Sequence, residues 1–161
     1  MKAPSSPPLR LRDYAAADEE AAIELWRRTW QQAYPRIDFT ERVAWWRERW
    51  RSELVPAAKI VVAEMDGILE GFVTVDPKTG YLDQIVVAPE FWGSNVALML
   101  LDAGKRISPA LLELLVNKDN ARAIALARRL GAVRDPAAAT IDGNDTVYRH
   151  PAPERLQSGQ L

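Results

Sequence analysis

The segment of this sequence best suited to bind a ligand is the short turn from Glu90 to Asn95. It follows an apolar stretch that ends at Pro89 and leads into a helical pattern that begins at Val96. A buried strand that enters a helix through a short turn leaves several backbone N–H groups directed at one concave spot. Those donors and the positive end of the helix dipole can bind phosphate or pyrophosphate. The sequence therefore predicts an anion site here, with a plain structural connection as the alternative, because strand–turn–helix segments are common.

Composition excludes several other kinds of chemistry. The chain has 161 residues, no cysteine and one histidine, His150. The lack of cysteine excludes disulfides, thiolate metal sites and a cysteine nucleophile, and a single histidine leaves no histidine cluster for a metal. A Ser-His-Asp hydrolase would depend on that one residue near the end of the chain. We therefore expect no metal cofactor.

Length and charge point to one ordinary globular domain. Of the 161 residues, 48 % are apolar and 27 % are charged, and the net charge is −1. This balance argues against nucleic-acid binding, which needs a surplus of Lys and Arg on one face. No apolar run approaches the roughly 20 residues that a membrane helix needs, and the Pro-rich start does not resemble a signal peptide. We expect a cytoplasmic protein with a flexible N-terminus over 1–8, a single domain over 9–150 and a flexible tail over 151–161.

The first part of the domain predicts two helices after a short strand over 9–12. Apolar residues recur at helical spacing over 18–34, after an acidic first turn that suits the helix dipole. A second helix is predicted over 40–54, with Thr40 as its N-cap and Pro56 closing it. Both helices carry tryptophans on their apolar stripes, so core positions are expected for Trp26, Trp30, Trp46 and Trp50.

The middle of the chain predicts three antiparallel strands. Stretches 59–65 and 68–75 are separated by Asp66-Gly67, which favours a two-residue type I′ hairpin because both turn positions need a positive φ. A further turn over 77–80 leads into the apolar strand over 82–88. These strands should form a meander that ends at the candidate anion turn.

The last part continues to alternate helices and strands. A helix is predicted over 96–106, and the apolar stretch over 110–116 fits either a strand or a buried helical turn. Residues 117–120 then cap a helix that ends before Gly131. Short strands are predicted at 132–134 or a little beyond and at 146–150, with a turn over 142–145 between them. This order predicts an α/β fold with a mixed, mostly antiparallel central sheet flanked by helices on both faces.

Segments in this order resemble the GNAT superfamily of N-acetyltransferases, and the resemblance covers about 9–150. Residues 64–72 resemble the family's hairpin, and 85–101 resemble its acyl-CoA signature, in which a strand ends in V-x-P and the turn reads Q/R-x-x-G-x-G/A. Residues 120–132 resemble its N-x-x-A-x-x-x-Y-x-x-x-G-F helix. The resemblance implies the acyl-CoA N-acyltransferase fold and transfer of an acetyl group from acetyl-CoA to a primary amine of a small molecule or peptide by direct attack.

The chain departs from the family's motifs at several positions. Trp92 stands where the family has Gln or Arg, and Asn95 stands where it has the central Gly. Ala127 replaces the tyrosine credited with protonating the CoA thiolate, and Ala132 replaces Phe. These departures leave two alternatives to an active enzyme. One is a degenerate acetyltransferase fold that binds acyl-CoA or another ligand as a sensor or interaction module, and the other keeps the fold without a CoA site.

The resemblance also implies which residues hold the cofactor. Backbone groups of the strand before the turn should pair with the pantetheine arm as an added strand would, and amides of the turn should surround the pyrophosphate. The asparagine of the later helix should hydrogen-bond the pantetheine as well as cap its helix, and an arginine there would offer charge to the phosphates, with a solvated helix face as the alternative. The implied residues are Ile85, Val86, Val87, Trp92, Gly93, Ser94, Asn95, Val96, Ala97, Asn120, Ala123 and Arg128.

Few residues are suited to the acetyl-transfer chemistry itself. The resemblance assigns polarisation of the thioester carbonyl to a backbone N–H near Val87. Asp83, on the same strand, is the candidate general base, with a plainer role as the partner of an arginine. Tyr148 is the candidate acid, with core packing as its plainer role. Homodimers are frequent in such families, and for the unknown amine acceptor the resemblance points to Trp30, Tyr34 and Trp45.

Overall fold

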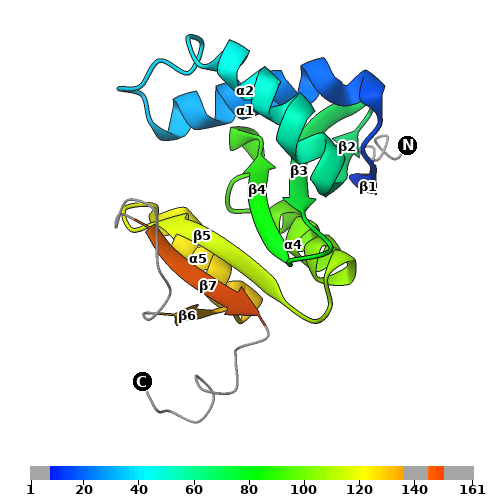
Figure 1. The fold of residues 1–161 in the computed structure, drawn as a ribbon. Helices are drawn as coiled ribbons and strands as arrows, with labels where there is room; N and C mark the ends of the chain where they lie inside the picture. Colours follow the sequence, from blue (N-terminus) through cyan, green and yellow to red (C-terminus); the bar gives the residue numbers. More distant parts are fainter. Residues whose placement is uncertain (1–7, 136–144, 151–161) are drawn as a thin grey trace, which may run out of the picture.

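The centre of the computed structural model is one seven-stranded sheet (Figure 1), and the structure describes residues 8–135 and 145–150. The predicted flexible ends, apart from residue 8, and most of the predicted turn over 142–145 lie outside these residues. The strands lie in the order β1-β2-β3-β4-β5-β7-β6. Their bounds are Arg10–Asp13 (β1), Lys59–Met65 (β2), Ile68–Val75 (β3), Tyr81–Val87 (β4), Leu112–Asn117 (β5), Val133–Asp135 (β6) and Asp145–His150 (β7).

The first four strands form an antiparallel unit, and the last three of them pair as the turn residues predict. Asp66 and Gly67 have φ values of 53° and 77°, the positive values that a type I′ hairpin needs. β2, β3 and β4 pair in sequence as the predicted meander, and β1 pairs with β2 at the edge. The chain therefore reaches the candidate anion turn at the end of a well-paired strand.

The other strands join this unit through one short parallel contact. Among the described residues, β5 pairs with β4 only at Tyr81–Glu113 and Leu82–Leu114, and it then runs antiparallel to β7. The stretch over 110–116 is therefore largely a strand and not a helical turn. Figure 1 shows β4 and β5 starting side by side and then diverging. The middle of the sheet thus opens into a wedge.

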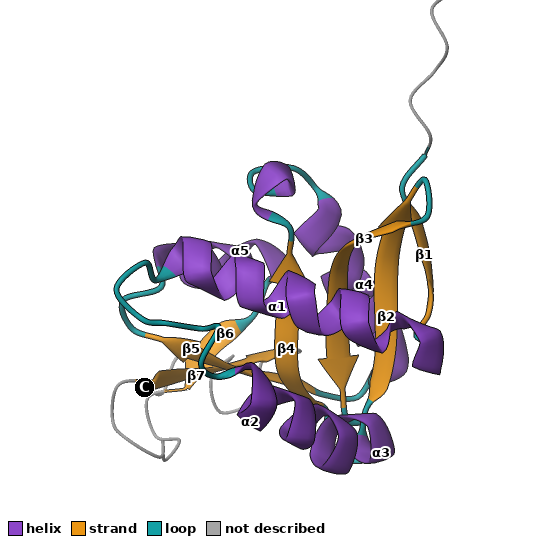
Figure 2. Cartoon of the chain, turned by 90° about the horizontal axis from the view of Figure 1, so that it is seen from above, coloured by secondary structure: helices purple, strands orange, loops and turns teal. Residues whose placement is uncertain are grey.

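Helices cover both faces of the sheet (Figure 2). The helices α1 (Glu19–Ala33) and α2 (Val43–Arg49) belong to one layer, and α4 (Val96–Ile107) and α5 (Ala121–Leu130) belong to the other. Shorter turns are η1 (Ala16–Asp18), the π-helical η2 (Trp50–Leu54), α3 (Val55–Ala57) and η3 (Pro89–Phe91). No helix in the described part of the chain is long and apolar enough to cross a membrane.

The prediction for the second helix is wrong at both ends. Helical turns run from Val43 through α2, η2 and α3 to Ala57, so Thr40 is not the N-cap and Pro56 lies inside the helical run. At the start, Asp38 Oδ1 accepts a hydrogen bond from the Thr40 N–H at 3.0 Å, which holds this segment in a turn. At the end, Pro56 has no N–H to donate, and the widened turn η2 precedes it.

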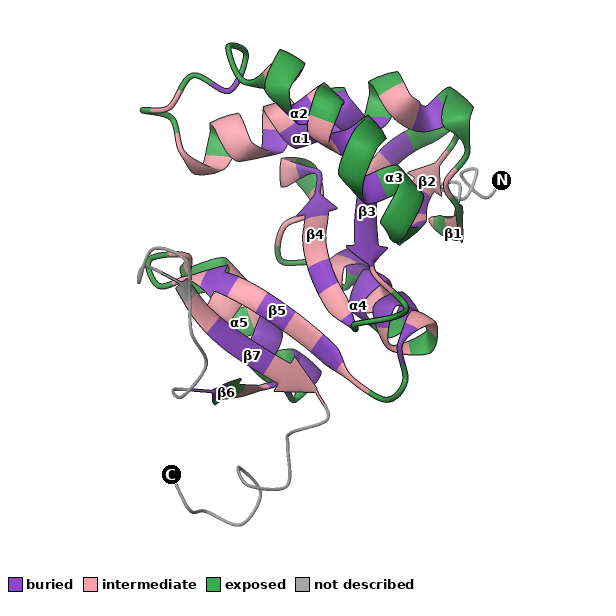
Figure 3. Cartoon of the chain, in the orientation of Figure 1, coloured by how far each residue is buried: buried purple, intermediate pink, exposed green. Residues whose placement is uncertain are grey.

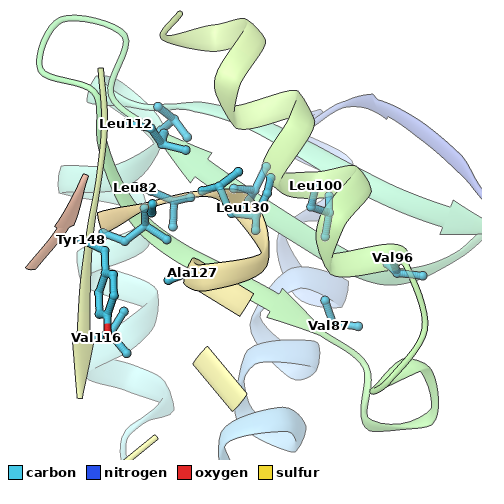
Figure 4. Close-up of a cluster of buried hydrophobic side chains, with 14 of the residues drawn as sticks. Leu82, Val87, Val96, Leu100, Leu112, Val116, Ala127, Leu130 and Tyr148 are labelled. Carbon is cyan, nitrogen blue, oxygen red and sulfur yellow. The ribbon is translucent and has the colours of Figure 1, made fainter. Parts of the chain in front are cut away.

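Two hydrophobic cores lie on opposite faces of the sheet. In the layer of α1 and α2, Trp26 stacks on Trp46 with ring centroids 4.6 Å apart, and Trp50 meets Phe72 edge-on at 5.3 Å. In the layer of α4 and α5, mainly aliphatic side chains pack against the strands (Figure 4). Figure 3 shows β3 buried along most of its length, as expected for a strand between two helical layers. Both layers meet at the wedge beside β4.

Candidate functional site

The end of β4 directs backbone groups into the wedge. The Ala88 N–H donates to the Glu70 carbonyl at 2.8 Å, and Gly71 lies opposite Val87 in the ladder. In an antiparallel pair this pattern directs the N–H and C=O of Val87 away from β3, and Ile85, two residues earlier, points the same way. A ligand in the wedge can therefore bond to this edge as an added strand would.

A cavity of about 320 Å³ occupies the wedge. The edge of β4 lines its middle, α1 lines one part, and the turn before α4 and the helix α5 line the rest. Because α1 and α5 belong to opposite layers, the cavity reaches both faces of the sheet. Such a cavity can admit two reactants from opposite sides.

The turn between β4 and α4 has fewer free amides than its sequence predicts. Alternate amides already donate to acceptors within the turn, at 3.1 to 3.3 Å, and these are the amides of Trp92, Ser94 and Val96. No acceptor in the described part of the chain contacts the amides between and after them, those of Gly93, Asn95 and Ala97. The positive φ of Gly93, 82°, helps the turn to bend. An anion at the turn therefore has a set of alternate donors.

The side chain of Trp92 connects three parts of the site. Its Nε1 donates to the Val87 carbonyl at 2.9 Å, which joins the turn to the end of β4. The guanidinium of Arg122 lies over the ring, with Cζ 3.5 Å from the ring centroid, which joins the turn to the start of α5. The carbonyl of Val87 is thereby occupied, while its N–H still faces the wedge.

Asn120 caps α5 and also borders the cavity. Its Oδ1 accepts a hydrogen bond from the Ala123 N–H at 3.1 Å, the bond expected of an N-cap. At the other end, Gly131 stops the helix with φ 88°, as its position in the sequence predicts. The helix thus begins at the cavity and holds Asn120 in a fixed orientation there.

The charged side chains on the cavity wall are positive. Arg122 and Arg129 line it, and no carboxylate does so among the described residues. The nearby Glu90 pairs with Arg28 at 2.6 Å, and this hydrogen bond holds the pKa of Glu90 below its usual value. Burial, with the Glu90 charge as a smaller cause, raises the pKa of Glu70 on β3. The described residues also include no group of three or more His, Cys, Asp or Glu side chains suited to a metal. With two arginines and no carboxylate among its described lining residues, the wall favours an anionic ligand.

The structure places Asp83 outside the cavity wall. A β-bulge leaves Asp83 without a partner on β3, and its carboxylate accepts hydrogen bonds from Arg49 Nη1 at 2.9 Å and Nη2 at 2.5 Å. Gln84 Nε2 adds a third bond at 3.0 Å. The pair raises the pKa of Arg49 and ties α2 to β4. These contacts fit the plainer role as an arginine partner, and the base role stays a prediction.

Tyr148 and two of the three predicted acceptor-binding aromatics also lie outside the cavity wall. Tyr148 is 4 % exposed and packs beside Val116 in the core (Figure 4). Trp30 does line the cavity, where it stacks on Tyr34 at a centroid distance of 5.6 Å. Trp45 is 60 % exposed and lies away from the cavity wall. Trp30 is only half-buried, unlike the other tryptophans expected in the core, Trp26, Trp46 and Trp50, because it faces the cavity.

The structure gathers most of the predicted cofactor residues and adds others. Those that line the cavity are Ile85, Val86, Val87, Trp92, Gly93, Ser94, Ala97, Asn120 and Ala123. The remaining three do not line it: Asn95, Val96 and Arg128. Sequence reasoning missed Thr29, Ala33, Phe91, Arg122, Ala125 and Leu126, and Arg129 also lines the cavity. Helical spacing on α5 could have pointed to Arg122, Leu126 and Arg129 as one face, but only the position of α5 decides which face meets the cavity.

Separated central strands, the edge of β4 that faces the wedge and the amides of the turn together form a site suited to an elongated ligand with an anionic part. The sequence profile of the acetyltransferase (GNAT) family matches residues 19–132. The chain therefore belongs to the acetyltransferase (GNAT) family and is classed with its enzymes, the acyl-CoA N-acyltransferases.

Solved structures of GNAT proteins share this fold. A PaiA N-acetyltransferase from Thermoplasma acidophilum in complex with coenzyme A aligns with a TM-score of 0.69 at 20 % identity, over 88 % of this chain and 98 % of that one. The ribosomal-protein-S18-alanine N-acetyltransferase from Escherichia coli aligns with a TM-score of 0.65 at 20 % identity, over 88 % of this chain and 91 % of that one. Among curated proteins, none matches the chain in sequence.

Proposed function

We propose that the protein transfers an acetyl group from acetyl-CoA to a primary amine of a small molecule or peptide in the wedge between β4 and β5. The observation that carries the proposal is the cavity there, which reaches both faces of the sheet beside the free edge of β4. The pantetheine arm would pair with Ile85 and Val87, and the pyrophosphate would bind at the turn before α4. The acceptor would enter from the side of α1.

The chemistry requires few side chains. The amine nitrogen attacks the thioester carbon, the C–S bond breaks, and the CoA thiolate leaves with its electron pair. The Val87 N–H, which faces the wedge, would stabilise the negative charge that develops on the carbonyl oxygen. The ammonium proton passes to solvent, and water protonates the thiolate. This route needs no tyrosine at Ala127 and operates with Asp83 bound to Arg49.

The acceptor end of the cavity favours an amine with an apolar part. Trp30, Ala33 and Phe91 contribute apolar surface there, and stacking on Tyr34 holds the Trp30 ring in place. An alkyl or aromatic amine fits such a wall better than a polycation does, because the charged side chains on the described part of the wall are arginines. We further propose that the reaction takes place in the cytoplasm, where acetyl-CoA is available, and that the protein acts as a homodimer.

A second function, binding of acyl-CoA without turnover, is favoured by one specific observation. Ala127 is fully buried at the position of the family's tyrosine, so no hydroxyl reaches the cleft from that point of α5. A protein of this kind would act as a sensor or interaction module. It would bind the cofactor and release no thiol.

Calorimetric titration with acetyl-CoA and with CoA, followed by a thiol-release assay over a panel of alkyl and aromatic amines, separates these functions. Saturable micromolar binding with amine-dependent thiol release supports the acetyltransferase. Binding with no thiol release across the panel supports the non-catalytic module. No binding at millimolar acetyl-CoA would contradict both and leave a GNAT fold without its cofactor.

A further inference from the structure

Among the described residues, the exposed Arg122 guanidinium has a ring contact but no hydrogen-bond partner for its N–H groups. Its Cζ lies over the Trp92 ring, 3.5 Å from the ring centroid, and the ring in turn donates a hydrogen bond from Nε1 to the Val87 carbonyl. No carboxylate or carbonyl in the described part of the chain accepts a hydrogen bond from it. Stacking leaves the edge of a guanidinium free, and that edge carries five N–H donors. A cation with unused donors on a cavity wall is suited to receive an anion.

The turn beside Arg122 also lacks the polar side-chain donor that the family motif has there. In the family this turn begins with Gln or Arg, whereas here it begins with Trp92. The ring cannot donate to a phosphate, because its one N–H is bonded to Val87. The ring instead offers a platform for a cation from α5, next to the free amides of Gly93, Asn95 and Ala97. Arg122, on the neighbouring helix, thus places a cationic donor beside the turn.

We propose that Arg122, positioned by the face of Trp92, binds the pyrophosphate of acetyl-CoA together with the free amides of the turn. This inference rests on the proposed function, because it assigns a binding residue to the same cofactor. Bidentate guanidinium–phosphate bonds are among the stronger charge-assisted hydrogen bonds. Arg122 is therefore the specificity residue that selects a cofactor with a pyrophosphate.

The first test compares R122Q, R122K and a matched control, R106Q, by calorimetric titration. Arg106 is exposed at the end of α4 and does not line the cavity, so R106Q removes the same charge elsewhere. We expect R122Q to weaken acetyl-CoA binding about 10- to 100-fold, the range for a lost charge-assisted hydrogen bond. R122K keeps the charge without the bidentate geometry and should lie in between, and R106Q should bind as the wild type does.

The ligand 3′-dephospho-acetyl-CoA identifies the phosphate involved. It keeps the pyrophosphate, so R122Q should weaken its binding by the same factor as for acetyl-CoA. A loss confined to acetyl-CoA would place Arg122 at the 3′-phosphate and overturn the inference. Equal losses for R122Q and R122K, with a matching fall in the melting temperature, would make Arg122 a packing residue and also overturn it.

Substitution of Trp92 tests the platform. W92F keeps an aromatic face and should retain most of the Arg122 contribution, whereas W92A removes the face. In the W92A background, R122Q should therefore cost less affinity than in the wild type. If the affinity losses of W92A and R122Q simply add, Trp92 does not position Arg122, and the proposed role of Trp92 is wrong. Wild-type protein that binds no acetyl-CoA would contradict the proposed function, whereas wild-type binding with R122Q unchanged contradicts only this inference.

Discussion

At the scale of single residues, substitution of the Asp83–Arg49 pair distinguishes a catalytic role of Asp83 from a structural one. Both side chains are largely buried, at 13 % and 24 % exposure, and two hydrogen bonds join them. We expect D83N to lower the free energy of unfolding by about 1–3 kcal/mol, because Arg49 loses a charged acceptor. The rate of acetyl transfer should stay within about twofold of the wild type, because the Asp83 carboxylate takes no part in the proposed reaction. Urea denaturation and the thiol-release assay measure the two effects.

R49Q provides the matched control for D83N. If the pair acts as a unit, the double variant should be scarcely less stable than either single variant. A loss of activity of about 100-fold in D83N, with a change in the pH profile and no fall in stability, would instead identify Asp83 as the general base.

Asn120 allows its two roles to be separated by two substitutions. N120A removes the cap bond to the Ala123 N–H and should cost about 1 kcal/mol of stability. N120S keeps a capping oxygen but shortens the side chain at the cavity wall, so it should be nearly as stable as the wild type while binding acetyl-CoA less tightly. Thermal denaturation and calorimetry are the measurements, and N120S that binds as the wild type does would leave Asn120 with the cap role alone.

The residue types predicted the turn before α4 and the N-cap of α5, but they did not predict that Arg122 would lie at the site. Asn120 was recognisable because a cap residue is a local feature followed by its own helix. Arg122 lies two residues further on and resembles any solvated arginine in the sequence. Its position over Trp92 depends on the packing of α5 against the turn, a contact between distant segments. Local patterns do not carry that information.

At the scale of elements, Gly71 sets how closely α4 approaches β3. A Cβ at this position would lie 2.9 Å from Leu100 Cδ1 and 3.0 Å from the Val86 carbonyl oxygen. We expect G71A to destabilise the protein by about 1–3 kcal/mol through overpacking. The control is G104A within α4, whose Cβ would meet Val75 no closer than 3.4 Å and which should be neutral or slightly stabilising. Equal stability of the two variants in urea would show that the core adapts around residue 71.

The junction of β1 and α1 should depend on pH through Asp18. The carboxylate accepts two hydrogen bonds from Arg12 at 2.8 Å, and these chiefly lower the pKa of Asp18 from its ordinary 3.8. A lowered folded-state pKa means that the stabilisation is complete above the unfolded value and is lost as the pH falls through the folded value. D18N should therefore be less stable than the wild type by about 1–3 kcal/mol near neutral pH.

That difference should begin to shrink once the pH falls below the ordinary pKa of Asp18, because the unfolded chain then binds a proton that the folded carboxylate does not. It should vanish below the lowered folded-state pKa, where the folded carboxyl is protonated too. Urea denaturation of both proteins near neutral pH and again in acid checks this. A constant difference at all pH values would assign the effect of D18N to packing and not to charge.

Elements with strong local signals were predicted well, and the others needed tertiary contacts. The hairpin at Asp66-Gly67 follows from backbone sterics alone. The stretch over 110–116 was ambiguous because its apolar run has no period, and pairing with β7 decides it. The second helix begins later than predicted because Asp38 holds the preceding residues in a turn, and it continues past Pro56 because the wide turn η2 accommodates the ring.

At the scale of the whole molecule, the cofactor should act as a structural component. The described strands β5, β7 and β6 join the first four strands through two residue pairs, so the wedge is the weak seam of the sheet. A ligand that fills it binds only the folded protein and should stabilise it by about 2.7 kcal/mol at 100 times its Kd. Thermal denaturation with acetyl-CoA measures this. Adenosine serves as the control, since it lacks both pantetheine and pyrophosphate and should give no comparable shift.

The overall architecture was predictable, while the wedge was not. Alternating helical and strand patterns predicted the order of the elements and a mixed sheet with helices on both faces, and this order and its motifs resemble the GNAT family. The divergence of β4 and β5 depends on where two distant strands stop pairing, after Leu82 and Leu114. No local pattern records that point, so the cavity required the structure.

Because β4 pairs with β5 over a short stretch, deuterium exchange at particular backbone amides of β4 can report on the wedge. The amide hydrogens of Ile85 and Val87 belong to a central strand yet face the wedge, whereas that of Val86 between them bonds to β3. In D₂O the two wedge-facing amides should therefore exchange for deuterium well before their neighbour does. A bound pantetheine arm would slow exchange at these two amides selectively. The alternation of fast and slow exchange along one strand would therefore report, amide by amide, whether the wedge is occupied.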